Sequence, residues 1–164
     1  MSTIIQIKIA ELFVGNSDHI ITANGVGSCV IIMLYDRLAR IGGAAHVILP
    51  SASHFHETSK IFERDAEGKR FVKYADQAVD TLIEEIEMLG GSREHTVAKL
   101  VGGAHMFALL EGDQHGIGWK NTVAAREELH KLGITIETEV VGGTVGRNIR
   151  FDCATGLVEI ITKV

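Results

Sequence analysis

A cysteine and a histidine in neighbouring segments are the residues of this chain best suited to chemistry. Cys29 follows a glycine-rich stretch and opens the apolar segment 30–35, and His46 lies in a second apolar segment, residues 41–49. A thiolate attacks carbonyl carbons, and a neighbouring imidazole can take the thiol proton and return it to the leaving group. The two residues together therefore indicate acyl-transfer chemistry.

The two apolar segments are expected to form a β-hairpin that sets the distance between these side chains. If the hairpin pivots between Arg37 and Leu38, Cys29 opposes His46 on one face of the sheet, with Cβ atoms about 5 Å apart. A slip of one residue would send the two side chains to opposite faces. Taken alone, each residue also has a structural interpretation, Cys29 as a small buried hydrophobe and His46 as a core histidine.

Specific motifs surround this pair. The most specific are Gly27-Ser28-Cys29-Val30 and Ala45-His46-Val47-Ile48-Leu49-Pro50, in this order and at this spacing. Matching motifs continue along the chain as Lys73-Tyr74-Ala75-Asp76, Lys99-Leu100-Val101-Gly102-Gly103-Ala104, Ile117-Gly118 with Asn121, and Gly142-Gly143-Thr144-Val145-Gly146-Arg147. From about Ile20 to Ile160 the chain thus resembles the CheD family, the chemoreceptor glutamine deamidases of bacterial and archaeal chemotaxis.

The resemblance implies roles for individual residues. Cys29 carries over as the nucleophile and His46 as the general base. The family has a threonine as a third active-site residue, six positions before the cysteine; here Ala23 stands at that position and Thr22 one residue earlier. Three alternatives follow: Thr22 serves as the third catalytic group, the third group is dispensable, or the activity is weakened.

The resemblance also implies a reaction and its partners. The chain would convert glutamine side chains of methyl-accepting chemoreceptors to glutamate through a thioester on Cys29, with neither a cofactor nor a metal. Backbone N–H groups around residues 27–30 would hold the oxyanion, and methyl-ester hydrolysis at the same carbonyl is chemically adjacent. The alternative function is an adaptor with weak or no catalysis, because family members also bind the phosphatase CheC and raise its activity on phosphorylated CheY.

Composition sets the broader limits. The 164 residues predict a single domain, 1–164, and 46% hydrophobic with 23% charged residues is ordinary for a soluble globular protein. A net charge of −5 gives no general attraction to nucleic acid or to anionic membranes. Two cysteines do not make a disulfide scaffold, so a reduced, cytoplasmic setting is expected. The chain has neither a signal-peptide pattern nor an apolar run long enough for membrane insertion.

Hydrophobic periodicity predicts the remaining elements. Helical spacing favours helices over residues 73–89 and 121–132. Strands are expected over residues 4–14, with Ile5, Ile7 and Ile9 on one face, and over 20–23, 96–101 and 134–141, followed by a hairpin of 148–152 with 157–163. The fold class is therefore mixed α/β with largely antiparallel pairing. By resemblance it is a layered sandwich of helices and two β-sheets, similar to the catalytic domains of deamidating toxins.

Two further features have alternative interpretations. The polar segment 51–69 contains His54 and His56, which could belong to a metal-dependent hydrolase, or could lie in a surface loop near the active-site mouth. The glycine-rich residues 142–147 predict a tight turn rather than a phosphate loop. The family resemblance implies that this turn lies near the catalytic face. Cys153, with no histidine near it in sequence, is expected to be structural or incidental.

Overall fold

The computed structural model describes residues 2–51, 63–105 and 116–162. Within these residues the chain forms a six-stranded sheet of order β6-β2-β5-β4-β7-β8 and a four-stranded sheet of order β1-β3-β9-β10. Two strand pairs, β1 with β3 and β7 with β8, are parallel and the others are antiparallel. The predicted mixed, largely antiparallel α/β fold class is confirmed. No helix in the described residues is long and apolar enough to cross a membrane.

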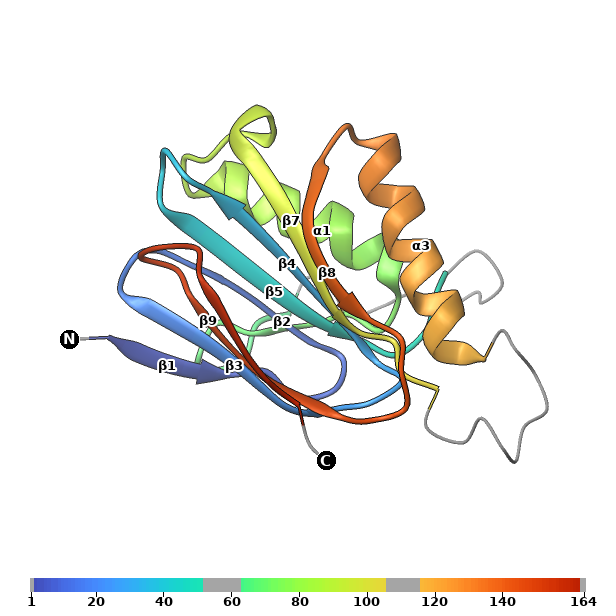
Figure 1. Ribbon diagram of the computed structural model, residues 1–164. Coiled ribbons are helices and arrows are strands. Elements are labelled where there is room, and N and C mark those ends of the chain that lie inside the picture. Colours follow the sequence, from blue (N-terminus) through green and yellow to red (C-terminus); the bar gives the residue numbers. More distant parts are fainter. Residues whose placement is uncertain (1, 52–62, 106–115, 163–164) are drawn as a thin grey trace.

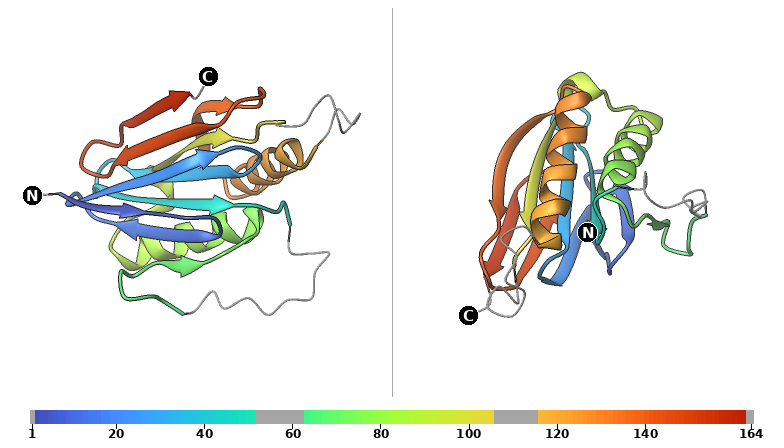
Figure 2. Two further views of the ribbon diagram at one scale, coloured as in Figure 1. Left: turned by 90° about the horizontal axis from the view of Figure 1, so that it is seen from below. Right: turned by 90° about the vertical axis from the view of Figure 1, so that its right-hand side faces the viewer.

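The elements have the following bounds. The larger sheet contains β2 (Glu11–Gly15), β4 (Val30–Asp36), β5 (Ile41–Val47), β6 (Arg70–Phe71), β7 (Thr96–Gly102) and β8 (Thr135–Val141). The smaller sheet contains β1 (Thr3–Gln6), β3 (His19–Val26), β9 (Arg147–Asp152) and β10 (Val158–Thr162). The helices are α1 (Ala75–Met88), the short 3₁₀ helix η2 (Arg93–His95) and α3 (Ile117–Lys131). The first and last strands, β1 and β10, form the two edges of the smaller sheet (Figure 2).

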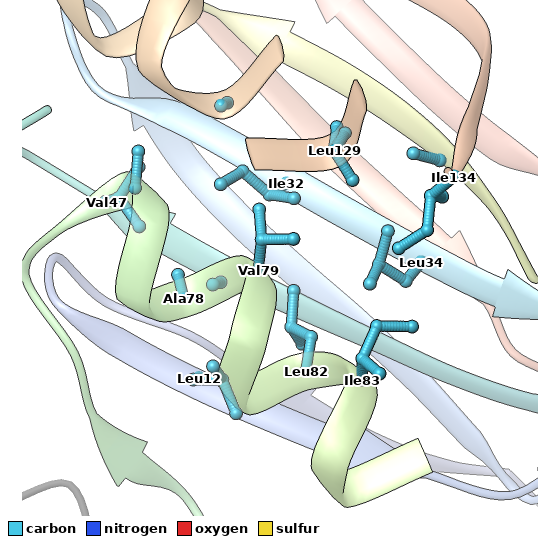
Figure 3. Packing of buried hydrophobic residues seen from close by; sticks show 14 of the residues in the cluster. Leu12, Ile32, Leu34, Val47, Ala78, Val79, Leu82, Ile83, Leu129 and Ile134 are labelled. Atoms are coloured by element: carbon cyan, nitrogen blue, oxygen red, sulfur yellow. The ribbon is translucent and has the colours of Figure 1, made fainter. Parts of the chain in front are cut away.

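The helices α1 and α3 cover one face of the larger sheet (Figure 1). The apolar stripe of α1 packs there as its helical periodicity predicted, with Val79, Leu82 and Ile83 facing Ile32 and Leu34 of β4 (Figure 3). Burying each such side chain contributes about 1.5–3 kcal/mol. This core fixes β4, whose first residue directly follows Cys29.

A second core fills the space between the two sheets. Ile21 and Phe151 of the smaller sheet pack there against Ile31 and Met33 of β4. Cys153 is fully buried in this core, which agrees with its predicted structural role. The inter-sheet core ends near Cys29, which is half-buried and packs against it.

The prediction of one strand over residues 4–14 is wrong. The segment is divided between β1 in the smaller sheet and β2 in the larger sheet. A turn separates them, in which Ala10 has a positive φ of 68° and the Glu11 N–H donates to the Lys8 carbonyl at 2.9 Å. Ile9, which was expected on the buried face, is 56% exposed. Apolar residues alternate on both sides of the turn, so their pattern does not reveal the change of sheet.

The hairpin of β4 and β5 forms, but its register differs from the predicted one by two residues. Ile31, not Cys29, opposes His46, and the last pair before the turn is Asp36 with Ile41. The Asp36 carboxylate accepts hydrogen bonds from the N–H groups of Leu38 and Ala39, each at 2.9 Å. These bonds stabilise a four-residue turn between the two strands. Because the shift is an even number of residues, it leaves each side chain on its predicted face.

The other predicted elements are confirmed with shifted ends. The predicted helix 73–89 is α1, and the hairpin of 148–152 with 157–163 is β9 with β10. The predicted helix 121–132 begins four residues earlier, at Ile117. The predicted strand 20–23 extends to Val26 through a bulge at which Gly25 has a φ of 65°.

Candidate active site

Cys29 sits in a turn that the end of β7 holds in place. Its carbonyl accepts a hydrogen bond from the Gly103 N–H at 2.8 Å, and the Gly27 carbonyl accepts one from the Ala104 N–H at 2.9 Å. Gly102 has a φ of 116°, and a Cβ atom there would lie 2.3 Å from the Cys29 carbonyl oxygen. Only glycine permits this approach, so the β7 end fixes the backbone of Cys29.

His46 lies on β5 and faces the inter-sheet core, on the side of the sheet where Ile31 and Ala44 lie. It is 3% exposed, and its Nδ1 lies 3.4 Å from the Ile7 carbonyl oxygen. When Nδ1–H donates to this carbonyl, Nε2 carries no proton and can accept one. The Ile7 carbonyl thus selects the tautomer that a general base requires.

The structure brings Cys29 and His46 to one face but not to directly opposed positions. Ile31 opposes His46, and Cys29 lies two residues before Ile31. The side chains of Cys29 and His46 are therefore diagonal neighbours. Such neighbours are about 7–8 Å apart between residue positions and within reach of long side chains. Within the described residues no hydrogen bond joins the Cys29 thiol to the His46 ring. Catalytic hydrogen bonds often tighten only when the substrate binds.

Burial determines the protonation of both groups. It raises the pKa of the Cys29 thiol above its ordinary value, against a smaller opposing effect of the residue's own backbone N–H. Burial also lowers the pKa of His46, against smaller opposing effects of the Ile7 carbonyl and the Glu11 carboxylate. Both shifts favour a neutral thiol beside a neutral imidazole.

Thr22 and Ala23 lie on opposite faces of β3. Ala23 is fully buried in the inter-sheet core, on the side where His46 lies. Thr22 is partly exposed, and its carbonyl accepts a hydrogen bond from the Ile7 N–H at 2.8 Å. Strand alternation directs the Thr22 side chain away from the inter-sheet core. A catalytic role for Thr22 stays a prediction, and this alternation does not favour it.

Comparisons with known proteins bear on this geometry. The sequence model described as CheD chemotactic sensory transduction matches residues 48–162. Proteins named probable chemoreceptor glutamine deamidase CheD are similar along nearly the whole chain. The one from Pyrococcus abyssi is 38% identical over 98% of this chain and 92% of its own length. The one from Geobacter metallireducens, CheD 2, is 40% identical over 98% of this chain and 94% of its own length. The one from Desulforamulus reducens is 38% identical over 96% of this chain and 90% of its own length. The chain belongs to the CheD family.

The glycine-rich turn of residues 142–147 lies beside the end of β7 that holds the Cys29 turn. The Gly142 N–H donates to the Gly102 carbonyl at 2.9 Å, which places the predicted tight turn of residues 142–147 beside the β7 end. Arg147, 7% exposed, donates to the carbonyls of Gly102 at 3.1 Å and Gly142 at 2.9 Å. This turn, which the resemblance implies near the catalytic face, therefore lies beside the Cys29 turn.

Three contributors were not assigned a role from the sequence. Asn121, fully buried in α3, donates to the backbone carbonyls of Ser28 and Ile48, at the end of the hairpin that carries Cys29 and His46. Arg147 was named only as part of a motif. Ile7 contributes its backbone carbonyl, a group that every residue has, so the sequence gives no sign of this role. His54 and His56, considered as metal ligands, lie outside the described residues.

Proposed function

We propose that this chain is a chemoreceptor glutamine deamidase in which Cys29 is the nucleophile and His46 the general base. The observation that carries the proposal is their common placement at one end of the inter-sheet face, with His46 Nδ1 directed at the Ile7 carbonyl. The relatives bear the name of this activity, and they match this chain along nearly its whole length.

The first half of the reaction forms a thioester. His46 Nε2 takes the thiol proton as Cys29 Sγ attacks the carboxamide carbon of a glutamine side chain. In the described residues the N–H groups of Gly27, Ser28 and Cys29 donate to no other backbone carbonyl. They are therefore available to the oxyanion, where each donor contributes about 3 kcal/mol in comparable sites. The imidazolium then gives its proton to the departing amine, and ammonia leaves.

The second half consumes one water. His46 removes a proton from the water as its oxygen attacks the thioester carbon, and the thiolate leaves and regains that proton. The products are a glutamate side chain, ammonia and the starting enzyme. Because the pKa of Cys29 is raised and that of His46 lowered by burial, the proton moves during the attack rather than before it.

The Ile7 carbonyl orients His46 without the help of a threonine side chain. It is the hydrogen-bond partner of His46 Nδ1, whereas the threonine position is occupied by Ala23. A backbone carbonyl can hold the imidazole in one tautomer as a side-chain acceptor does. The departure at Ala23 is thus compatible with catalysis.

The test is ammonia release from a purified chemoreceptor cytoplasmic fragment, with mass spectrometry to locate the converted glutamines. Cys29→Ala should lower the rate by at least about 10³-fold and His46→Asn by about 10²–10⁴-fold, while Cys153→Ala retains activity. Activity that survives a chelator but not thiol alkylation would argue against a metal-dependent hydrolase. Equal silence of the wild type and Cys29→Ala, with retained binding of a CheC phosphatase, would instead support the adaptor alternative.

A further inference from the structure

A buried asparagine in α3 reaches both segments that carry the proposed catalytic pair. Asn121 is 0% exposed, and its Nδ2 donates to the carbonyl oxygen of Ser28 at 3.2 Å and to that of Ile48 at 3.1 Å. Ser28 directly precedes Cys29, and Ile48 lies two residues after His46. One amide group therefore joins the nucleophile's turn to the strand of the base.

The two hydrogen bonds stand where the ladder between β4 and β5 stops. Its last registered pair at this end is Val30 with Val47, and the next residues outward are Cys29 and Ile48. There the side chain of Asn121 spans the two strands in place of the ladder. An amide NH₂ suits this position because it has two donors, one for each carbonyl.

The placement of Asn121 follows from how closely α3 approaches the end of β7. Gly118, in the first turn of α3, has no room for a side chain, since a Cβ atom would lie 2.6 Å from the Ala104 carbonyl oxygen. Ala104 and its neighbour Gly103 are the residues that hydrogen-bond the Cys29 turn. The start of α3 therefore lies at the end of the sheet where β4 begins and β5 ends (Figure 1).

The other amide atom gives a second argument. Asn121 Oδ1 is buried and accepts no hydrogen bond from the described residues. An unpaired buried acceptor costs free energy, so packing alone would favour an apolar side chain of the same shape. The NH₂ group, with its two carbonyl partners, is what the position requires.

We propose that Asn121 is a positioning residue, which holds the Cys29 turn and the end of β5 at the separation that proton transfer between Cys29 and His46 needs. The inference rests on the proposed function for the identity of this pair. A displacement of about 1 Å between reacting groups can cost about 10²-fold in rate. Loss of the two Asn121 hydrogen bonds should therefore lower kcat.

The first experiment replaces the amide without changing its shape much. Asn121→Leu should lower kcat for receptor deamidation by about 10–100-fold, as loss of an orienting partner does, and change KM by less than about twofold. Asn121→Asp has the same shape and no NH₂ donor, so it should show the same loss of kcat. It replaces Asn121→Leu in the experiment if that variant does not fold. The matched control is Thr81→Val on α1, which should retain full activity. Among the residues that the structure describes, the buried Thr81 hydroxyl bonds only a carbonyl of its own helix.

The second experiment needs no deamidation and separates this inference from the proposed function. Alkylation of Cys29 by iodoacetamide is followed in wild type, Asn121→Leu, His46→Asn and the double variant, with buried Cys153 as an internal reference. If Asn121 acts through the pair, Asn121→Leu slows alkylation in the wild-type background and adds nothing to His46→Asn. Additive losses, or a folded Asn121→Leu protein with wild-type alkylation and kcat, would overturn the inference.

Discussion

At the scale of single residues, burial decides how the Cys29–His46 pair works. The thiol is half-buried and the imidazole is 3% exposed, so water solvates neither charged form well. A resting thiolate beside an imidazolium would need this lost solvation to be replaced by strong hydrogen bonds. The Ile7 carbonyl is the partner of the ring, and it favours the tautomer that accepts a proton at Nε2.

The raised pKa of Cys29 predicts the pH dependence of its alkylation. Burial lifts this pKa above the ordinary 9.0, so the thiolate fraction is small at neutral pH and grows into the alkaline range. We expect iodoacetamide to modify Cys29 slowly at neutral pH, at a rate that still rises beyond pH 9. Peptide mass spectrometry of quenched samples measures the rate. A rate that is already at its maximum near neutral pH and does not rise above pH 9 would mean a resting ion pair and contradict the neutral-pair mechanism.

Restoring the family's threonine should improve the rate of this enzyme by little or nothing. Ala23 is fully buried in the inter-sheet core, so Ala23→Thr adds volume and a hydroxyl to a packed site, at a cost of about 1–3 kcal/mol of unfolding free energy. Since the Ile7 carbonyl already orients His46, kcat should rise by no more than a few-fold. Urea unfolding and ammonia release measure the two effects.

The matched control for that variant is Thr22→Ala, which lies on the other face of β3 and should leave kcat unchanged. A gain of about tenfold in Ala23→Thr, or loss of activity in Thr22→Ala, would show that a threonine hydroxyl is needed after all.

At the scale of elements, the site depends on a close contact between α3 and the end of β7. Glycine in a helix usually costs about 1 kcal/mol relative to alanine, so Gly118→Ala would ordinarily stabilise. Here the added Cβ would lie 2.6 Å from the Ala104 carbonyl oxygen and 2.7 Å from Gly103 backbone atoms. We expect Gly118→Ala to lower the unfolding free energy by about 1–3 kcal/mol instead.

The same substitution should also lower kcat, because it moves Asn121 away from its two carbonyl partners. Lys120→Ala, on the exposed side of the same helical turn, is the control and should change neither stability nor kcat appreciably. A Gly118→Ala protein more stable than wild type would contradict the close packing described.

The elements also show which information the sequence contains. Cys29 and His46 were predicted on one face from an assumed hairpin pivot, and the prediction holds because the observed register differs from the assumed one by an even number of residues. The register was not readable, because it depends on the Asp36 carboxylate closing a four-residue turn. The early start of α3 was missed because glycine is a poor helix former. Gly118 is nevertheless helical, since its close packing against the end of β7 leaves no room for a side chain. The Ile7 carbonyl belongs to a residue 39 positions from His46 and is identified only by the fold.

At the scale of the whole molecule, the two faces of the larger sheet have different tasks. One face carries the helix layer and its apolar core, and the other carries the inter-sheet core that ends at Cys29. Between α1 and α3, Asp80 lies beside Glu128; although the residue is exposed by its overall surface, partial desolvation of the carboxyl and the neighbouring Glu128 carboxylate raise the pKa of Asp80 to about 7. The raised pKa of Asp80 thus belongs to the side of the sheet away from the proposed catalytic pair.

The raised pKa of Asp80 predicts a pH dependence of stability that is independent of catalysis. A carboxyl whose pKa is raised in the folded state binds a proton that the unfolded chain releases, so its stabilisation is complete below pH 3.8 and is lost as the pH rises through about 7. Asp80→Asn replaces one of the two neighbouring carboxylates by a neutral amide, which removes their repulsion at every pH. The variant should therefore melt above wild type at pH 8 and close to it at pH 4, with kcat unchanged. Differential scanning calorimetry at low ionic strength measures the difference, which salt should reduce. Glu84→Gln, on an exposed part of α1, should show no such divergence. A parallel shift at both pH values in Asp80→Asn would refute the raised pKa of Asp80.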